Sequence, residues 1–170
     1  MKKFKYITAI MLFISLFIVS CEKDDADTVK PVITITGPED DEAIFIGSEI
    51  HFEVDFSDDT ELKSYKVDIH SNTDGHSHKA VTTNDSVAFT FQKSWEFEPG
   101  LKNAKINHYE IEIPVLIDGK PILEGHYHFL VYCTDVAGNE SWTATEVEIL
   151  KSPSMKGNIA ISNKYPIKIK

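Results

Sequence analysis

The sequence predicts an all-β fold in which seven to eight short strands form a β-sandwich. Apolar and polar residues alternate in short stretches between residues 31 and 150, and a period of two is that of a strand with one buried face. Turn-forming groups separate these stretches, among them Asp118-Gly119 and Asp135–Asn139 (DVAGN). Of the 170 residues 42% are hydrophobic, which is enough for one domain with a core. Closure of the same strands into a barrel is the alternative.

The most regular of these stretches, residues 125–133, reads GHYHFLVYC. Its alternate residues are expected to face the core, namely Tyr127, Phe129, Val131 and Cys133. His126 and His128 then face outward from the other side of the strand. Cys133 is therefore expected to be a buried, unreactive thiol.

The other strands are expected at residues 31–36, 50–56, 62–70, 87–91, 93–97, 105–115 and 142–150. Their inward residues should join the same core, in particular Phe52, Val54, Val67, Ile69, Tyr109, Ile111 and Ile113. His51 and His108 are expected on the outer face of the sheet that contains strands 50–56 and 105–115. Residues 71–84 are polar and predict a loop. Residues 151–170 are basic and contain prolines, and they form either a tail or an additional edge strand.

Residues 1–20 are expected to be a targeting segment. Three lysines precede an apolar run, residues 7–19, that is too short for a good membrane-spanning helix. The run ends in Ile-Val-Ser-Cys21, which resembles the lipobox of bacterial lipoproteins. The resemblance implies cleavage before Cys21 and a lipid anchor on its thiol. The alternative is an ordinary secretory signal with an incidental cysteine.

Residues 21–30 are expected to be an acidic, flexible tether. Residues 22–25 (EKDD) resemble the signal that sends Bacteroidota lipoproteins to the outer cell surface. This resemblance implies an outer-membrane lipoprotein that is exposed at the cell surface. A plain acidic linker is the alternative.

The charge of the chain restricts its partners. Residues 1–20 contain three lysines and no acidic residue, so the remainder holds 14 lysines against 27 acidic residues, a formal net charge of −13. The chain contains no arginine. Such a surface disfavours the phosphate backbone of nucleic acids and favours cations.

Two motifs resemble strand F of bacterial immunoglobulin-like domains: the Gly125-x-Tyr127 start and the Asp135-x-Ala-Gly-Asn139 end. The resemblance implies an immunoglobulin-like sandwich over residues 31–150, with Tyr127 in the position of a tyrosine corner. Together with the lipobox, the stretches GHSH (residues 75–78) and GHYHF (residues 125–129) are similar to a Bacteroidota family of lipoproteins of unknown function. That similarity implies a fold and a location, and no activity.

Five of the seven histidines are expected to converge on one surface patch. In an immunoglobulin-like sandwich, strand 62–70 lies antiparallel to strand 125–133, so the end of the first meets the start of the second. The five residues are His70, His76, His78, His126 and His128. Imidazoles at this spacing suit Zn(II) or Cu(II), and Asp68 and Asp74 are expected to add oxygen ligands or to orient an imidazole. An adventitious cluster of surface histidines is the alternative.

Acidic residues in two turns form a second candidate metal site, suited to Ca(II). Asp58 and Asp59 follow strand 50–56, and Asp135 and Asn139 follow strand 125–133. In an immunoglobulin-like sandwich these turns share the end opposite to the histidines. The alternative is that Asp and Asn only cap the turns with their own side chains.

The signal for catalysis is weak, because no Ser-His-Asp order stands out and no Gly-x-Ser-x-Gly sequence occurs. We therefore expect a non-enzymatic envelope lipoprotein that binds a divalent transition metal. The rival interpretation is a surface module that binds a glycan or another envelope protein. Tyr132, Trp142 and Trp95 would then supply an aromatic platform.

Overall fold

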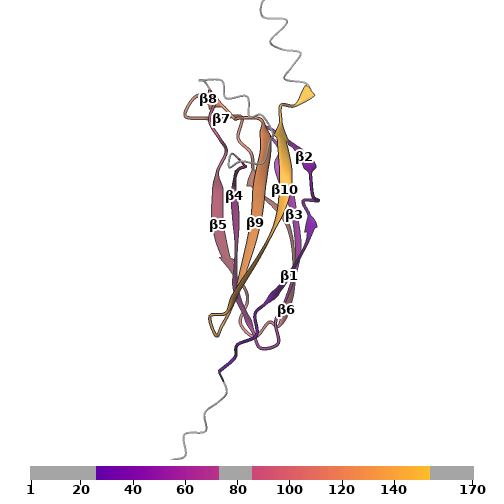
Figure 1. Cartoon of the computed structure of the whole chain (residues 1–170), viewed down its shortest axis with the longest axis vertical. Coiled ribbons are helices and arrows are strands. Elements are labelled where there is room, and N and C mark those ends of the chain that lie inside the picture. The colour runs from indigo at the N-terminus through magenta and orange to yellow at the C-terminus, as the bar shows by residue number, and fades with distance from the viewer. Residues whose placement is uncertain (1–25, 73–85, 154–170) are drawn as a thin grey trace, which may run out of the picture.

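The computed structural model describes residues 26–72 and 86–153, and within these ranges the chain forms a β-sandwich (Figure 1). Its strands there are β1 (Val32–Gly37), β2 (Glu42–Phe45), β3 (Glu49–Ser57), β4 (Leu62–Ser71), β5 (Phe91–Glu96), β6 (Asn103–Glu112), β7 (Leu116–Ile117), β8 (Lys120–Pro121), β9 (Gly125–Asp135) and β10 (Glu140–Leu150). The prediction of an all-β sandwich is confirmed. No helix in the described ranges is long and apolar enough to cross a membrane.

Two large sheets face each other. The three-stranded sheet has the order β1-β3-β6, and the five-stranded sheet has the order β2-β10-β9-β4-β5. Neighbouring strands are antiparallel except β2, which runs parallel to β10. The small β7–β8 hairpin closes around the predicted Asp118-Gly119 turn. The two ends of the described chain lie at opposite ends of the sandwich (Figure 1).

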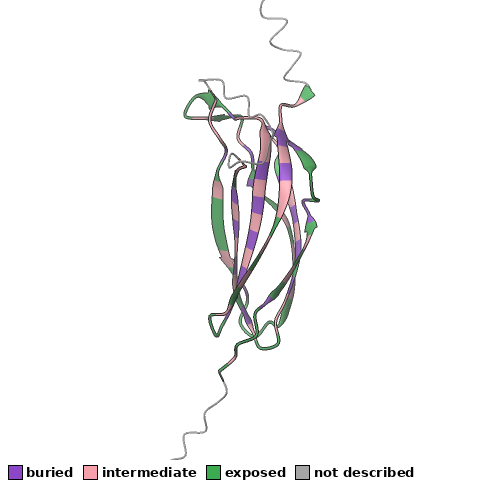
Figure 2. Ribbon diagram, viewed as in Figure 1, coloured by how far each residue is buried: buried purple, intermediate pink, exposed green. Residues whose placement is uncertain are grey.

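Inward residues of both large sheets form one core, and the alternation of burial along β9 and β10 is visible in Figure 2. The core includes the predicted residues Phe52, Val54, Val67, Ile69, Ile111, Ile113, Tyr127, Phe129, Val131 and Cys133. Cys133 has no exposed surface, and burial raises the pKa of its thiol to about 12. The reactive thiolate is therefore essentially absent at neutral pH, as expected for an inert core cysteine.

The predicted orientations of His108 and Tyr109 are wrong, and a β-bulge is the reason. Ile50 on β3 pairs with Ile111 on β6, and the next pair is Phe52 with His108. Between these two pairs β3 advances by two residues while β6 covers three. The extra residue reverses the alternation of inward and outward side chains in β6. Tyr109 is 54% exposed and stacks on His51, with ring centroids 4.9 Å apart. His108 instead packs between the sheets against Phe52, also at 4.9 Å between ring centroids.

Two further strand predictions need correction. Residues 87–91 and 93–97 do not form two strands; β5 is a single strand, and Val87 makes an isolated bridge to Ile122. The sequence pattern also does not predict β2, because its four residues, EAIF, are too few to display an alternation.

Tyr127 fastens the start of β9. Its side chain is fully buried, and its hydroxyl donates to the carbonyl oxygen of Leu123 at 2.7 Å and accepts from the amide of Phe89 at 3.2 Å. A tyrosine hydroxyl bonded to the backbone a few residues upstream is the contact made in a tyrosine corner. These bonds hold β9 where His126 and His128 begin its outer face.

Candidate metal centre on the outer face of the five-stranded sheet

His70 and His128 lie side by side on the outer face of the five-stranded sheet. The strands β4 and β9 are antiparallel neighbours, and these two residues are direct partners in their register. The ring centroids are 5.6 Å apart. The predicted ligands His76 and His78, together with Asp74, lie outside the described residues.

A carboxylate orients the His70 imidazole. Nδ1 of His70 lies 2.8 Å from Oδ1 of Asp68, and Oδ2 of Asp68 accepts a hydrogen bond of 2.9 Å from Gln92 Nε2. Because Nδ1 is occupied by this contact, His70 would bind a metal through Nε2. Such carboxylate–imidazole contacts fix the ring and the tautomer of metal-binding histidines.

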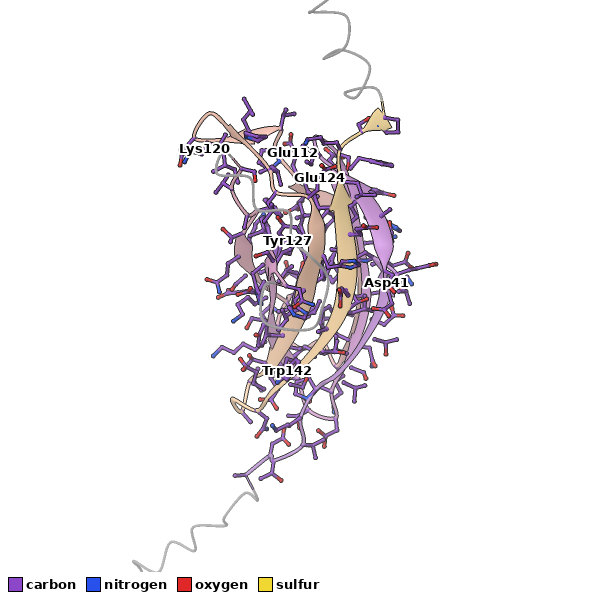
Figure 3. The ribbon with its side chains drawn as sticks, turned by 45° about the horizontal axis from the view of Figure 1, so that its top comes forward. Asp41, Glu112, Lys120, Glu124, Tyr127 and Trp142 are labelled. Atoms are coloured by element: carbon purple, nitrogen blue, oxygen red, sulfur yellow. The ribbon has the colours of Figure 1, made fainter. Side chains whose placement is uncertain are left out.

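His126 belongs to a more compact group of three donors. Its Nδ1 lies 2.9 Å from Oε1 of Glu146 on β10. Asp41, from the segment between β1 and β2, completes the group, and the three ligand atoms all lie within 4.8 Å of one another. We call Asp41, His126 and Glu146 the three-donor site. Figure 3 shows Asp41 beside β10 at the edge of the sheet.

The backbone holds Asp41 in place. Its amide donates to the carbonyl oxygen of Glu146 at 2.8 Å, and its φ of 59° is the left-handed conformation that Asp tolerates in turns. Oδ1 of Asp40 accepts from the amide of Glu146 and from the hydroxyl of Thr145, both at 3.0 Å. These two bonds hold the pKa of the Asp40 carboxyl below its usual value. The turn before β2 is thus tied to β10 by three hydrogen bonds.

The donor set fits a divalent transition metal. Zinc–ligand bonds of roughly 2.0–2.2 Å place neighbouring donor atoms about 3–4 Å apart, so the group needs only small side-chain adjustments. One imidazole nitrogen and two carboxylate oxygens are ligands that Zn(II) accepts and that also suit Cu(II). Glu148, the register partner of His126, adds a further negative charge beside the site.

The sequence prediction missed two residues of this site, Asp41 and Glu146. Glu146 could have been predicted from the sequence, because the Asp135–Asn139 turn fixes the β9–β10 register, in which Glu146 is the direct partner of His128. Asp41 could not have been predicted, since its position depends on how the chain crosses from one sheet to the other.

The predicted calcium ligands are divided between two arrangements. Asp58 and Asp59 form an acidic group with Asp27, with ligand atoms within 4.8 Å of one another. Asp135 is fully buried, and its two carboxylate oxygens accept from the amide and the side-chain Nδ2 of Asn139, at 2.8 and 2.7 Å. Nδ2 of Asn139 also donates to the carbonyl oxygen of Asp27 at 3.2 Å, which brings the two arrangements together.

The predicted aromatic platform loses one of its three residues. Trp95 lies between the two sheets, where its ring stacks on Tyr65 with centroids 4.9 Å apart. Trp142 and Tyr132 are direct cross-strand partners on the outer face of the five-stranded sheet. The platform on that face is therefore smaller than the sequence predicted.

Comparison with known proteins gives a family and no activity. Residues 19–150 match the family described as "Domain of unknown function (DUF4625)". Because the match covers well over half of the chain, the protein belongs to this family. No curated protein matches the chain.

Proposed function

We propose that this member of the DUF4625 family binds a divalent transition metal, Zn(II) or Cu(II), on the outer face of its five-stranded sheet. The observation that carries the proposal is the three-donor site, in which Asp41, His126 and Glu146 come from three separate segments and have their ligand atoms within 4.8 Å. His128 and His70 lie next to this site and extend the ligand set. His76 and His78 remain proposed ligands outside the described residues.

The arrangement favours capture of the metal over catalysis. The ligands stand on paired strands and on a turn fastened by hydrogen bonds, so little conformational freedom is lost when an ion binds. Nδ1 of His126 and Oε1 of Glu146 lie 2.9 Å apart, and an entering ion would take both atoms as ligands and displace any proton bound to either of them. The outer sheet face is open to solvent, and a non-enzymatic role is proposed.

We also propose a location and a finer fold assignment. The lysine-rich start, apolar run and Ser-Cys21 order support a lipoprotein anchored in the outer membrane through Cys21, and residues 22–25 support exposure at the cell surface. The antiparallel pairing of β4 with β9 and the Tyr127–Leu123 hydrogen bond support an immunoglobulin-like sandwich. The family similarity to lipoproteins of Bacteroidota belongs to the same proposal.

Calorimetric titration of the full-length protein with ZnCl2 and CuSO4 tests the site. His126→Ala and Glu146→Gln should each weaken metal binding at least tenfold. Substituting a residue that only orients a ligand already lowers metal affinity by about tenfold or more. The matched control is His51→Ala, because His51 lies on the three-stranded sheet and stacks on Tyr109. Parent-like affinity in both site variants, or an equal loss in the control, would reject the assignment.

Three further variants define the boundaries of the site. His70→Ala and His128→Ala should each weaken binding, because the neighbouring pair extends the ligand set, and parent-like affinity in both variants would restrict the ligands to the three-donor site. Cys133→Ser should leave metal binding unchanged, since the thiol is buried and protonated.

A second candidate is a calcium site at the opposite end of the sandwich, formed by Asp27, Asp58 and Asp59. Oδ2 of Asp27 and Oδ2 of Asp58 are out of contact with solvent and have no hydrogen-bond partner within the described residues. Oxygen-only ligation suits Ca(II). The test is a thermal unfolding series with and without 5 mM CaCl2 on the parent and on Asp58→Asn, with roughly millimolar affinity as the expected range. The same melting temperature with and without calcium in the parent would dismiss this candidate.

A further inference from the structure

A row of three side chains crosses the outer face of the five-stranded sheet away from the metal centre. Trp142 on β10 is the direct partner of Tyr132 on β9, and Tyr132 is the direct partner of Lys66 on β4. Trp142 is 63% exposed, the highest value among the large hydrophobic residues of the described ranges. The Lys66 ammonium lies 3.9 Å from the centroid of the Tyr132 ring. This cation–π contact holds the tyrosine ring and leaves Trp142 as the open aromatic surface.

The row is separate from the three-donor site. Tyr132 and His126 are six residues apart on β9, which corresponds to roughly 20 Å along a strand. Figure 3 shows Trp142 near one end of the sheet and Glu124, which precedes β9, near the other. A sugar ring stacked on Trp142 would therefore not contact a metal held by the three-donor site.

The surroundings of Trp142 are polar on one side and mixed on the other. The next row toward the β9–β10 turn contains Thr134 and Glu140, whose side-chain oxygens are 3.4 Å apart. The row on the other side contains the Asp68 carboxylate, the half-buried Leu130 and the small exposed side chain of Ala144. The apolar area is thus confined to one indole and a few neighbouring groups. A stable protein interface needs about 800 Å² on each partner with an apolar centre, so this surface is poorly suited to a protein.

A sugar ring matches these features. It presents a flat face of C–H groups, which an exposed indole can cover, and hydroxyl groups around its rim, which can pair with carboxylates, hydroxyls and an ammonium group. The charge of the chain restricts the sugar further. With a formal net charge of −13 after residue 20, and with Asp68 and Glu140 flanking the row, the surface repels sulfated and uronic-acid glycans.

We propose that Trp142 is the stacking residue of a binding surface for neutral glycans, with Lys66, Thr134 and Glu140 hydrogen-bonding the hydroxyl groups of the sugar. One stacking residue on a flat face gives weak binding at a single site. A polysaccharide that can engage many copies of a membrane-anchored protein would be held more firmly than a monosaccharide.

The test uses the full-length protein on an array of immobilised neutral glycans, together with affinity electrophoresis in laminarin, galactomannan and xyloglucan. At least one neutral polysaccharide should retard the protein, and binding should quench or shift the emission of Trp142. Trp142→Ala should weaken binding at least tenfold, and Lys66→Met should weaken it to a lesser extent. Phe45→Ala is the matched control, because Phe45 is an exposed aromatic residue on the edge strand of the same sheet.

Several outcomes would overturn the proposal. The proposal fails if the protein binds no glycan on the neutral array, or if it binds heparin as tightly as the neutral glycans. It also fails if Trp142→Ala binds as tightly as the parent. Urea unfolding midpoints of the variants show whether a loss of binding reflects a loss of folding. Glycan binding should persist in EDTA and in His126→Ala. A failure of the glycan proposal can therefore be distinguished from a failure of the metal proposal. Loss of glycan binding in EDTA would reassign it to a metal-dependent site and overturn the role of Trp142.

Discussion

Removal of the Tyr127 hydroxyl is the sharpest test of how β9 is held. In Tyr127→Phe the ring keeps its place in the core, and two hydrogen bonds are lost, the bond donated to Leu123 O at 2.7 Å and the bond accepted from Phe89 N at 3.2 Å. The loss of the bond to Leu123 O costs about 1 kcal/mol of the free energy of unfolding. Phe89 is only 3% exposed, so its amide is left buried without a partner, at a cost of about 1–3 kcal/mol.

The expected loss of stability is therefore about 2–4 kcal/mol. Urea unfolding followed by tryptophan fluorescence measures it, and an unchanged m-value would show that the extent of unfolding is the same in both proteins. Tyr109→Phe is the control, because Tyr109 is 54% exposed and its hydroxyl should matter by less than about 0.5 kcal/mol. A loss below about 0.5 kcal/mol in Tyr127→Phe, or an equal loss in the control, would refute the role of the two hydrogen bonds.

Two further predictions test the core and the anchor. Phe129→Ala should cost about 3–5 kcal/mol in urea unfolding, because the ring is fully buried and packs 6.0 Å from the Phe52 ring centroid; a loss under about 1 kcal/mol would contradict this packing. Cys21→Ala should move the protein from the membrane fraction to the soluble fraction, since the lipid would have no attachment point; retention in the membrane would count against the lipobox.

The alternation of residues was sufficient to predict the core, because both large sheets bury one face. The residue pattern of β9 alone identified Tyr127, Phe129, Val131 and Cys133 as inward residues, and all four belong to the core. The same reasoning failed at His108 and Tyr109, where the bulge inserts one residue into β6. A bulge exchanges the inward and outward side chains of every residue beyond it, and no local sequence pattern predicts its position.

The candidate site could be predicted only where it depends on strand order. The pairing of His70 with His128 follows from the adjacency of β4 and β9. The three-donor site depends on more than that, because Asp41 reaches it through the parallel pairing of a four-residue edge strand with β10. Parallel pairing joins segments that are remote in sequence, and no residue pattern reveals its register.

His108 gives the stability of the sandwich a specific pH dependence. Its Nδ1 accepts from the amide of Glu110 at 3.3 Å, and its Nε2 is buried without a hydrogen-bond partner within the described residues. Burial lowers the pKa of the imidazole below its usual value, and Lys93 lowers it further, while Glu110 opposes the shift. The folded protein therefore favours the neutral imidazole.

The sign of the effect follows from this shift. In the unfolded chain a histidine takes up a proton below about pH 6.5, whereas His108 in the folded protein does so only at a lower pH. Its contribution to stability is complete above about pH 6.5 and is lost as the pH falls toward the folded-state pKa. Urea unfolding of the parent and of His108→Leu between pH 7.5 and 5 tests this, because all other titrating groups are common to both proteins. The parent should lose stability relative to the variant as the pH falls, and a difference that stays constant over this range would mean that His108 binds a proton equally well in the folded and unfolded chains.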